Sequence, residues 1–62
     1  MKGAVLLGPD EGMVFDTAGA EYVKVGRPAF ARDIPARVYR WRAVVIGSRV
    51  LEGWVFERET TV

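Results

Sequence analysis

Two runs of β-branched and aromatic residues near the C-terminal end of this 62-residue chain are joined by a single Gly47-Ser48 pair. Residues 38–46 and 49–57 alternate between polar and apolar side chains, which is the period of a β-strand. A two-residue connection that contains Gly fits the tight turns between antiparallel strands, because Gly adopts the positive φ that these turns need. The sequence therefore predicts a β-hairpin over residues 38–57.

This turn also fixes the register of the hairpin. Trp41 is expected directly opposite Trp54, and Tyr39 directly opposite Phe56. All four aromatic side chains then lie on one face, where cross-strand aromatic pairs stabilise a sheet. We expect these four residues to form the core of the protein.

The opposite face of the hairpin is expected to carry two arginines. Arg40 lies within reach of Glu57 in this register, and Arg42 lies opposite Gly53, where the missing side chain leaves space. The same face also carries five apolar residues: Val38, Val44, Ile46, Leu51 and Val55. Either the rest of the chain covers this second apolar face, or a partner does, such as the same hairpin of a second copy.

Three further strands are predicted before the hairpin. Residues 2–7 and 13–15 flank a Gly-Pro-Asp-Glu-Gly turn, and residues 21–25 alternate as a third strand. Residues 26–36 contain two prolines and are expected to form a long connection. The fold predicted over residues 1–62 is one all-β domain, a small five-stranded meander curled into a barrel-like, SH3-like shape.

The composition argues against catalysis. The chain has no Cys and no His, which leaves no disulfide, no thiolate nucleophile, no imidazole base and none of the commonest zinc ligands. Asp10, Glu11 and Asp16 surround the first turn, but turns collect such residues for local reasons. We expect no enzyme activity, no metal and no cofactor. No apolar run reaches the roughly 18 residues of a membrane span, and a cytoplasmic location is the default expectation.

The charges are distributed unevenly along the chain. The stretch from Lys24 to Arg49 has seven cations and one acid, a local charge of +6, whereas the remainder carries −5. Either the two parts neutralise each other in the fold, or the first forms a basic face. Arginine and aromatic residues are favoured at binding hot spots, and the candidate partner-binding residues are Arg27, Phe30, Arg32, Arg37, Arg40 and Arg42.

The order of these features resembles a group of short proteins of unknown function from actinobacteria and their phages. That group has a Gly-Gly-Pro-x-Asp-Gly-like turn after its first strand, where this chain has Leu7-Gly8-Pro9-Asp10-Glu11-Gly12. Its closing Tyr-containing and aromatic strands correspond here to residues 38–40 and 54–56. The first Gly of the turn is replaced by Leu7, and the Asp is shifted by one position. The resemblance implies a phage- or prophage-encoded accessory protein of the host cytoplasm and transfers no active residue.

The predicted function is that of a small, non-catalytic interaction module that binds a protein partner, with a homodimer as one form. The alternative is a small-barrel nucleic-acid-binding protein that uses the arginine-rich segment 27–49. The net charge of only +1, and the expectation that Glu52, Glu57 and Glu59 cancel part of the basic field, favour the protein partner.

Overall fold

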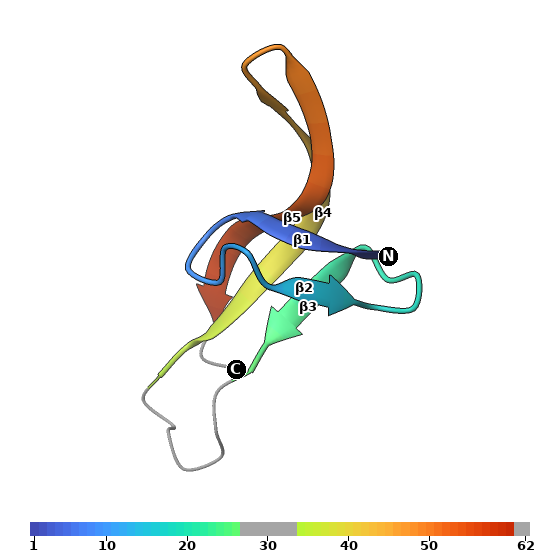
Figure 1. Ribbon diagram of the computed structural model, residues 1–62. Helices are drawn as coiled ribbons and strands as arrows, with labels where there is room; N and C mark the ends of the chain where they lie inside the picture. The colour runs from blue at the N-terminus through green and yellow to red at the C-terminus, as the bar shows by residue number, and fades with distance from the viewer. Residues whose placement is uncertain (27–33, 61–62) are drawn as a thin grey trace.

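The computed structural model describes residues 1–26 and 34–60, which form a five-stranded sheet and confirm the all-β prediction (Figure 1). The predicted connection over residues 26–36 lies mostly outside the described residues. The strands, in chain order, are β1 (Lys2–Leu7), β2 (Val14–Asp16), β3 (Tyr22–Val25), β4 (Ala36–Ile46) and β5 (Arg49–Thr60).

The strand order is β2-β1-β5-β4-β3, which differs from the predicted meander. The hairpins β1–β2 and β4–β5 and the pair β3–β4 are antiparallel as expected, but β1 pairs with β5 in parallel, at Val5↔Trp54 and Leu7↔Val55. The meander prediction was wrong because β1 reaches the C-terminal strand, which leaves β2 and β3 at opposite edges. In the described part of the chain the sheet is open, so the barrel-like closure is not confirmed.

The β4–β5 hairpin has the predicted register. Trp41 is paired with Trp54 and Tyr39 with Phe56, and the turn Gly47-Ser48 joins the strands. The two indole rings meet edge to face, with centroids 5.1 Å apart at an interplanar angle of 79°. Aromatic pairs prefer this arrangement because the positive ring edge meets the negative ring face.

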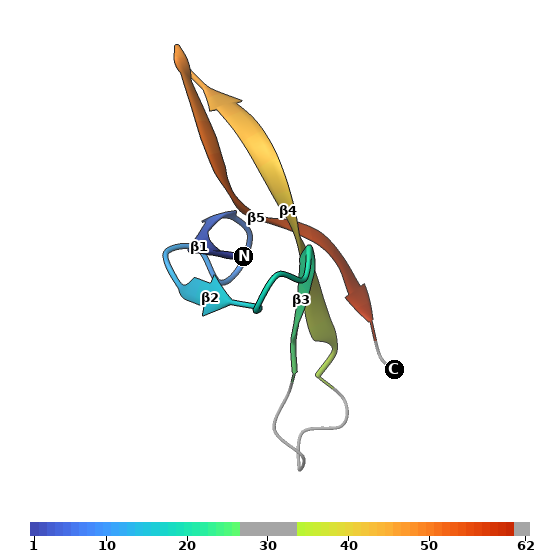
Figure 2. The same ribbon diagram turned by 90° about the vertical axis from the view of Figure 1, so that its right-hand side faces the viewer.

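The core lies between the aromatic face of β4–β5 and the β1–β2 hairpin, which lies to one side of β4–β5 in Figure 2. Val5, Tyr39 and Trp54 are its buried centre, with exposed fractions of 2%, 0% and 0%. The indole Nε1 of Trp54 donates a hydrogen bond to the carbonyl oxygen of Phe15 on β2, at 3.3 Å. This bond satisfies the one polar atom that the buried indole carries.

Close approach of β1 to β5 depends on Gly53. A Cβ atom at this position would lie 2.6 Å from the carbonyl oxygen of Ala4 and 2.8 Å from Cγ of Leu6. The parallel pairing of Val5 with Trp54 thus needs a residue without a side chain next to it. Gly53 had been expected only to make space for Arg42, which it does face across the hairpin.

The distal part of the β4–β5 hairpin projects away from the other strands (Figures 1 and 2). Among the described residues, β3 pairs with β4 only up to Arg40, and β1 pairs with β5 only at Trp54 and Val55. Residues 43–52, which we call the hairpin tip, therefore form a two-stranded ribbon. A compact 62-residue domain has a radius of gyration of about 10.5 Å, whereas this chain has 12.4 Å.

A substitution Gly53→Ala tests the contact between β1 and β5. We expect it to lower the free energy of unfolding by about 2 kcal/mol, because the new methyl group overlaps backbone as well as side-chain atoms. Gly26→Ala is the matched control, since nothing lies within 4 Å of a Cβ atom there. Urea unfolding, monitored by Trp fluorescence, measures the free energy of unfolding of both variants. Equal stability of the two variants would contradict the parallel pairing.

Candidate functional site

The candidate site lies on the outer face of the sheet, the side of β3, β4 and β5 that faces away from the aromatic core. Paired residues of antiparallel strands point to the same side, so the register decides which side chains share this face. Arg40 is paired with Tyr22 and Arg42 with Gly53. We define the outer face by its polar and aromatic side chains: Tyr22, Lys24, Arg40, Arg42, Glu57 and Arg58.

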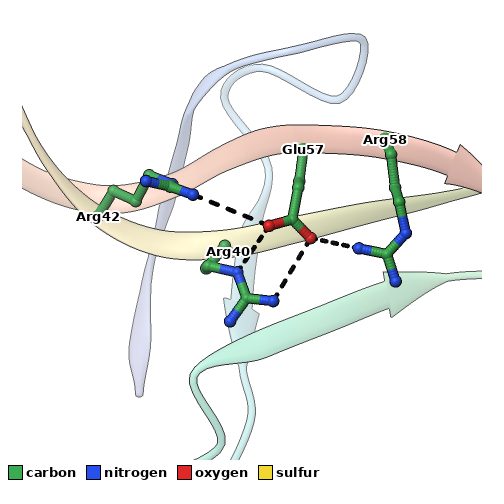
Figure 3. A network of polar contacts seen from close by, with 4 residues as sticks. All are labelled: Arg40, Arg42, Glu57 and Arg58. Atoms are coloured by element: carbon green, nitrogen blue, oxygen red, sulfur yellow. Dashed lines mark hydrogen bonds and ion pairs between the residues drawn. The ribbon is translucent and has the colours of Figure 1, made fainter.

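Three guanidinium groups on this face surround the carboxylate of Glu57 (Figure 3). Arg40 donates from Nε to Oε1 at 2.8 Å and from Nη2 to Oε2 at 3.5 Å. Arg58 donates from Nη1 to Oε2, and Nη2 of Arg42 lies 3.8 Å from Oε1. The predicted ion pair between Arg40 and Glu57 is therefore confirmed, and two further arginines join it.

These charges hold Glu57 in its ionised form. The hydrogen bond from Arg40 is the largest cause that lowers the pKa of the Glu57 carboxyl below its ordinary value, with further lowering from the charges of the other arginines. The arginine side chains remain open to solvent, at 41%, 55% and 59% exposure for Arg40, Arg42 and Arg58. One carboxylate thus partly neutralises three accessible cations.

A β-bulge in β5 brings Arg58 to this face. Tyr39 pairs with Phe56, but its neighbour Val38 pairs with Arg58, so Glu57 is an extra residue on β5. Simple alternation from Trp54 through Phe56 would place Arg58 on the aromatic face. The bulge shifts the alternation by one residue, which is why sequence reasoning missed Arg58.

Strand β3 adds an exposed aromatic ring and a further cation. Tyr22 is 57% exposed and is paired with Arg40. Lys24 is paired with Val38 and therefore shares the outer face. The alternation of residues 21–25 was visible in the sequence, but the register of β3 against β4 was not, because the connection between them is too long to fix it.

The acids of the hairpin lie mostly on the other face. Glu52 is paired with Ala43 and Glu59 with Arg37, and both of these partners share the aromatic side of β4. Of the three acids expected to cancel part of the field of the basic segment, Glu57 contacts Arg40 and Arg42, and Glu59 is paired with Arg37, whereas Glu52 is paired with the uncharged Ala43. Outside the hairpin tip, the six side chains that define the outer face comprise four cations and Glu57, a net charge of +3. Arg49, which is paired with Ile46 in the tip, lies on the same side of the hairpin, and the charge of Glu21, just before β3, also acts on Arg40.

Arg37 faces the aromatic side and is held within the chain. Its Nε and Nη2 donate to the two carboxylate oxygens of Asp10 at 2.6 and 3.1 Å, and the hydroxyl of Tyr39 donates to the same carboxylate at 2.7 Å. The Asp10 amide donates to the Tyr39 oxygen at 3.0 Å. This cluster ties the first turn to β4, so Arg37 stabilises the fold and does not lie beside Arg40 and Arg42.

The same cluster shifts the pKa values of Asp10, Arg37 and Tyr39. The hydrogen bond from Arg37, followed by that from Tyr39, lowers the pKa of Asp10, and the bond to Asp10 raises the pKa of Arg37. Burial is the main cause that raises the pKa of the Tyr39 hydroxyl. The fold therefore favours an ionised Asp10 and a neutral Tyr39.

The structure brings together two of the six predicted partner-binding residues, Arg40 and Arg42. Arg27, Phe30 and Arg32 lie outside the described residues, and their role stays a prediction. Over residues 1–26 and 34–60 no group of three His, Cys, Asp or Glu side chains is arranged to hold a metal ion. The same residues contain no helical segment with the length and apolarity that a membrane crossing requires.

No family model matches the chain, and neither a curated protein nor a solved structure is similar to it. The resemblance to short phage proteins stays a prediction from the sequence motifs alone.

The Asp10 cluster predicts a pH dependence of stability. A carboxyl whose pKa is lower in the folded than in the unfolded state stabilises the fold above the unfolded pKa of about 3.9, and this contribution is lost as pH falls towards the folded pKa. We expect Asp10→Asn to cost about 1–2 kcal/mol at pH 7, where the charged hydrogen bonds are intact. The difference from the wild type should shrink below about pH 4.

Denaturant unfolding of the wild type and Asp10→Asn at pH 7 and pH 3 provides the measurement. Asp16→Asn is the control, because its carboxylate lies on the exposed strand β2 and contacts only the nearby amide of Ala18 in the described structure. A difference for Asp10→Asn that is the same at both pH values would contradict the proposed ion pair.

Proposed function

We propose that this protein is a small, non-catalytic interaction module that binds a protein partner through its hairpin tip. The observation that carries the proposal is the exposure of four apolar side chains there. Val45 and Val50 are 71% and 67% exposed, and Ile46 and Leu51 are 48% and 37% exposed. Val45 and Val50 are paired and lie on one face, while Ile46 and Leu51 lie on the other.

Exposed apolar residues that gather at one place usually mark an interaction site. Complete burial of a Val, Leu or Ile side chain stabilises by about 1.5–3 kcal/mol relative to the exposed state. The four side chains of the tip can therefore supply a substantial part of a binding free energy, from which the cost of association must be subtracted. Their position at the end of a projecting ribbon lets a partner reach both faces.

The backbone of the tip supports the same proposal. Beyond Arg42 on β4 and before Gly53 on β5, the described structure pairs neither outer edge with another strand. A two-stranded ribbon is only marginally stable in water, and addition of a third strand is a common mode of protein recognition.

The partner that we propose for the tip is a second copy of the chain. Antiparallel pairing of β4 with β4 of the second copy, centred on Val45, places Val44 opposite Ile46 and Ala43 opposite Gly47. No like charges then face each other. The monomer also exposes 4416 Å², more than the roughly 4,000 Å² expected for a compact 6.9 kDa protein. An accessory role in a phage or prophage, implied by the sequence resemblance, is compatible with this homodimer.

Sedimentation equilibrium tests the proposal. We expect a species heavier than the 6.9 kDa monomer at micromolar concentration. The double variant Val45→Thr/Val50→Thr keeps the β-branched shape but adds hydroxyl groups, and we expect it to weaken association at least tenfold, since each buried hydroxyl costs about 1–3 kcal/mol. A wild type that remains monomeric at hundreds of micromolar would contradict the second copy as partner.

Val14→Thr is the matched control for this experiment. Val14 is 59% exposed and lies on β2, outside the tip. The same chemical change there should leave association unaltered. Equal weakening by both substitutions would point to a general change in solubility and not to an interface at the tip.

A further inference from the structure

We propose that the outer face binds single-stranded nucleic acid, with its arginines on the phosphates and Tyr22 as a stacking platform for one base. This proposal goes beyond the hairpin tip and uses other residues. It also differs from the binding mode expected from the sequence, because Arg37 is excluded and Tyr22, Lys24 and Arg58 are added.

The first argument is the separation of charge by the sheet. A protein with a net charge of +1 has little overall attraction for a polyanion. The six side chains that define its outer face nevertheless have a net charge of +3, since Glu52 and Glu59 are paired with residues of the aromatic side. Glu21, just before β3, offsets part of this charge at Arg40, while Arg49 adds a cation on the same side of the tip. A phosphate backbone that follows this face thus meets a basic surface.

The second argument is the donor geometry around Glu57. A guanidinium group has five N–H donors in a planar fork that matches phosphate oxygens. Glu57 accepts two hydrogen bonds from Arg40 and one from Arg58, while Arg42 approaches it only to 3.8 Å. The carboxylate therefore holds the three side chains together without saturating their donors (Figure 3).

The third argument is the place of Tyr22. Tyr22 as a whole residue is 57% exposed on the edge strand β3, and its pairing with Arg40 puts it beside the arginine cluster. Proteins that bind single strands combine a basic track along the backbone with aromatic rings on which bases stack. A duplex offers no unstacked base to this ring, which favours a single strand as the ligand.

Fluorescence anisotropy with a labelled twelve-nucleotide oligothymidylate tests the proposal. We expect a dissociation constant of tens of micromolar at 50 mM salt, within the usual range of non-specific binding. Three or four phosphate contacts predict a log–log salt slope of about −2 to −3. Absence of binding at 200 μM protein in 50 mM salt would overturn the proposal.

Two substitutions that should weaken binding and one that should tighten it distinguish this site from non-specific binding. We expect Tyr22→Ser to weaken binding about tenfold through lost stacking, and Arg42→Gln roughly fivefold to tenfold through one lost phosphate contact. Glu57→Gln removes the acid that contacts the three arginines and should tighten binding about fivefold. The gain is informative where circular dichroism shows that the variant is folded, because an unfolded chain with a basic segment can itself bind a polyanion. An unchanged or weaker affinity of folded Glu57→Gln would contradict the site.

Lys2→Gln is the charge-matched control, because Lys2 is paired with Asp16 of β2, at the opposite edge of the sheet from Tyr22 on β3. It should change affinity less than twofold, as should the tip variant Val45→Thr/Val50→Thr. Far-ultraviolet circular dichroism verifies that each variant is folded. The last experiment measures whether a twelve-residue oligoglutamate peptide displaces the labelled oligonucleotide. Equal competition by this peptide, together with no effect of Tyr22→Ser, would overturn nucleic acid as the ligand in favour of an acidic protein segment.

Discussion

The pairing of Trp41 with Trp54 across the β4–β5 hairpin is the contact on which the other features of this protein depend. It stabilises the register that the Gly47-Ser48 turn determines for the two longest strands, and that register places Tyr39 against Phe56 and Arg42 against Gly53. The buried indole of Trp54 also contacts the β1–β2 hairpin, because its Nε1 donates a hydrogen bond to the carbonyl oxygen of Phe15 on β2. A chain of this length, without cysteine, has little surplus stability, so one well-defined aromatic pair has a large effect on the whole.

The bulge at Glu57 is the second feature that shapes the sheet, because it changes which face the residues at the end of β5 lie on. Before the bulge β5 contributes aromatic residues to the core, and after it Arg58 lies on the opposite side. Glu57 itself becomes the common acceptor of the outer arginines. A bulge of one residue thus adds Arg58 to the face on which strand alternation already places Arg40 and Arg42.

Local sequence signals predicted the hairpin well, because a two-residue turn determines the register of both strands that it joins. They failed for the parallel contact of β1 with β5, which depends on a distant backbone approach at Gly53 that no local pattern encodes. For the candidate site, alternation predicted Arg40, Arg42 and Glu57 correctly. It missed Arg58, because no residue pattern in the sequence indicates the bulge. It missed Tyr22, because the register of β3 against β4 depends on contacts between residues far apart in the chain.

Nuclear Overhauser effects between the start of β4 and the end of β5 test this account most directly. The bulge predicts contacts of Tyr39 with Phe56 and of Val38 with Arg58. A regular ladder predicts the same first contact, but it pairs Val38 with Glu57. Observation of Val38 against Glu57, without a contact to Arg58, would place Arg58 on the aromatic face. That result would contradict both the basic outer face and the division of roles between the two sides of the sheet.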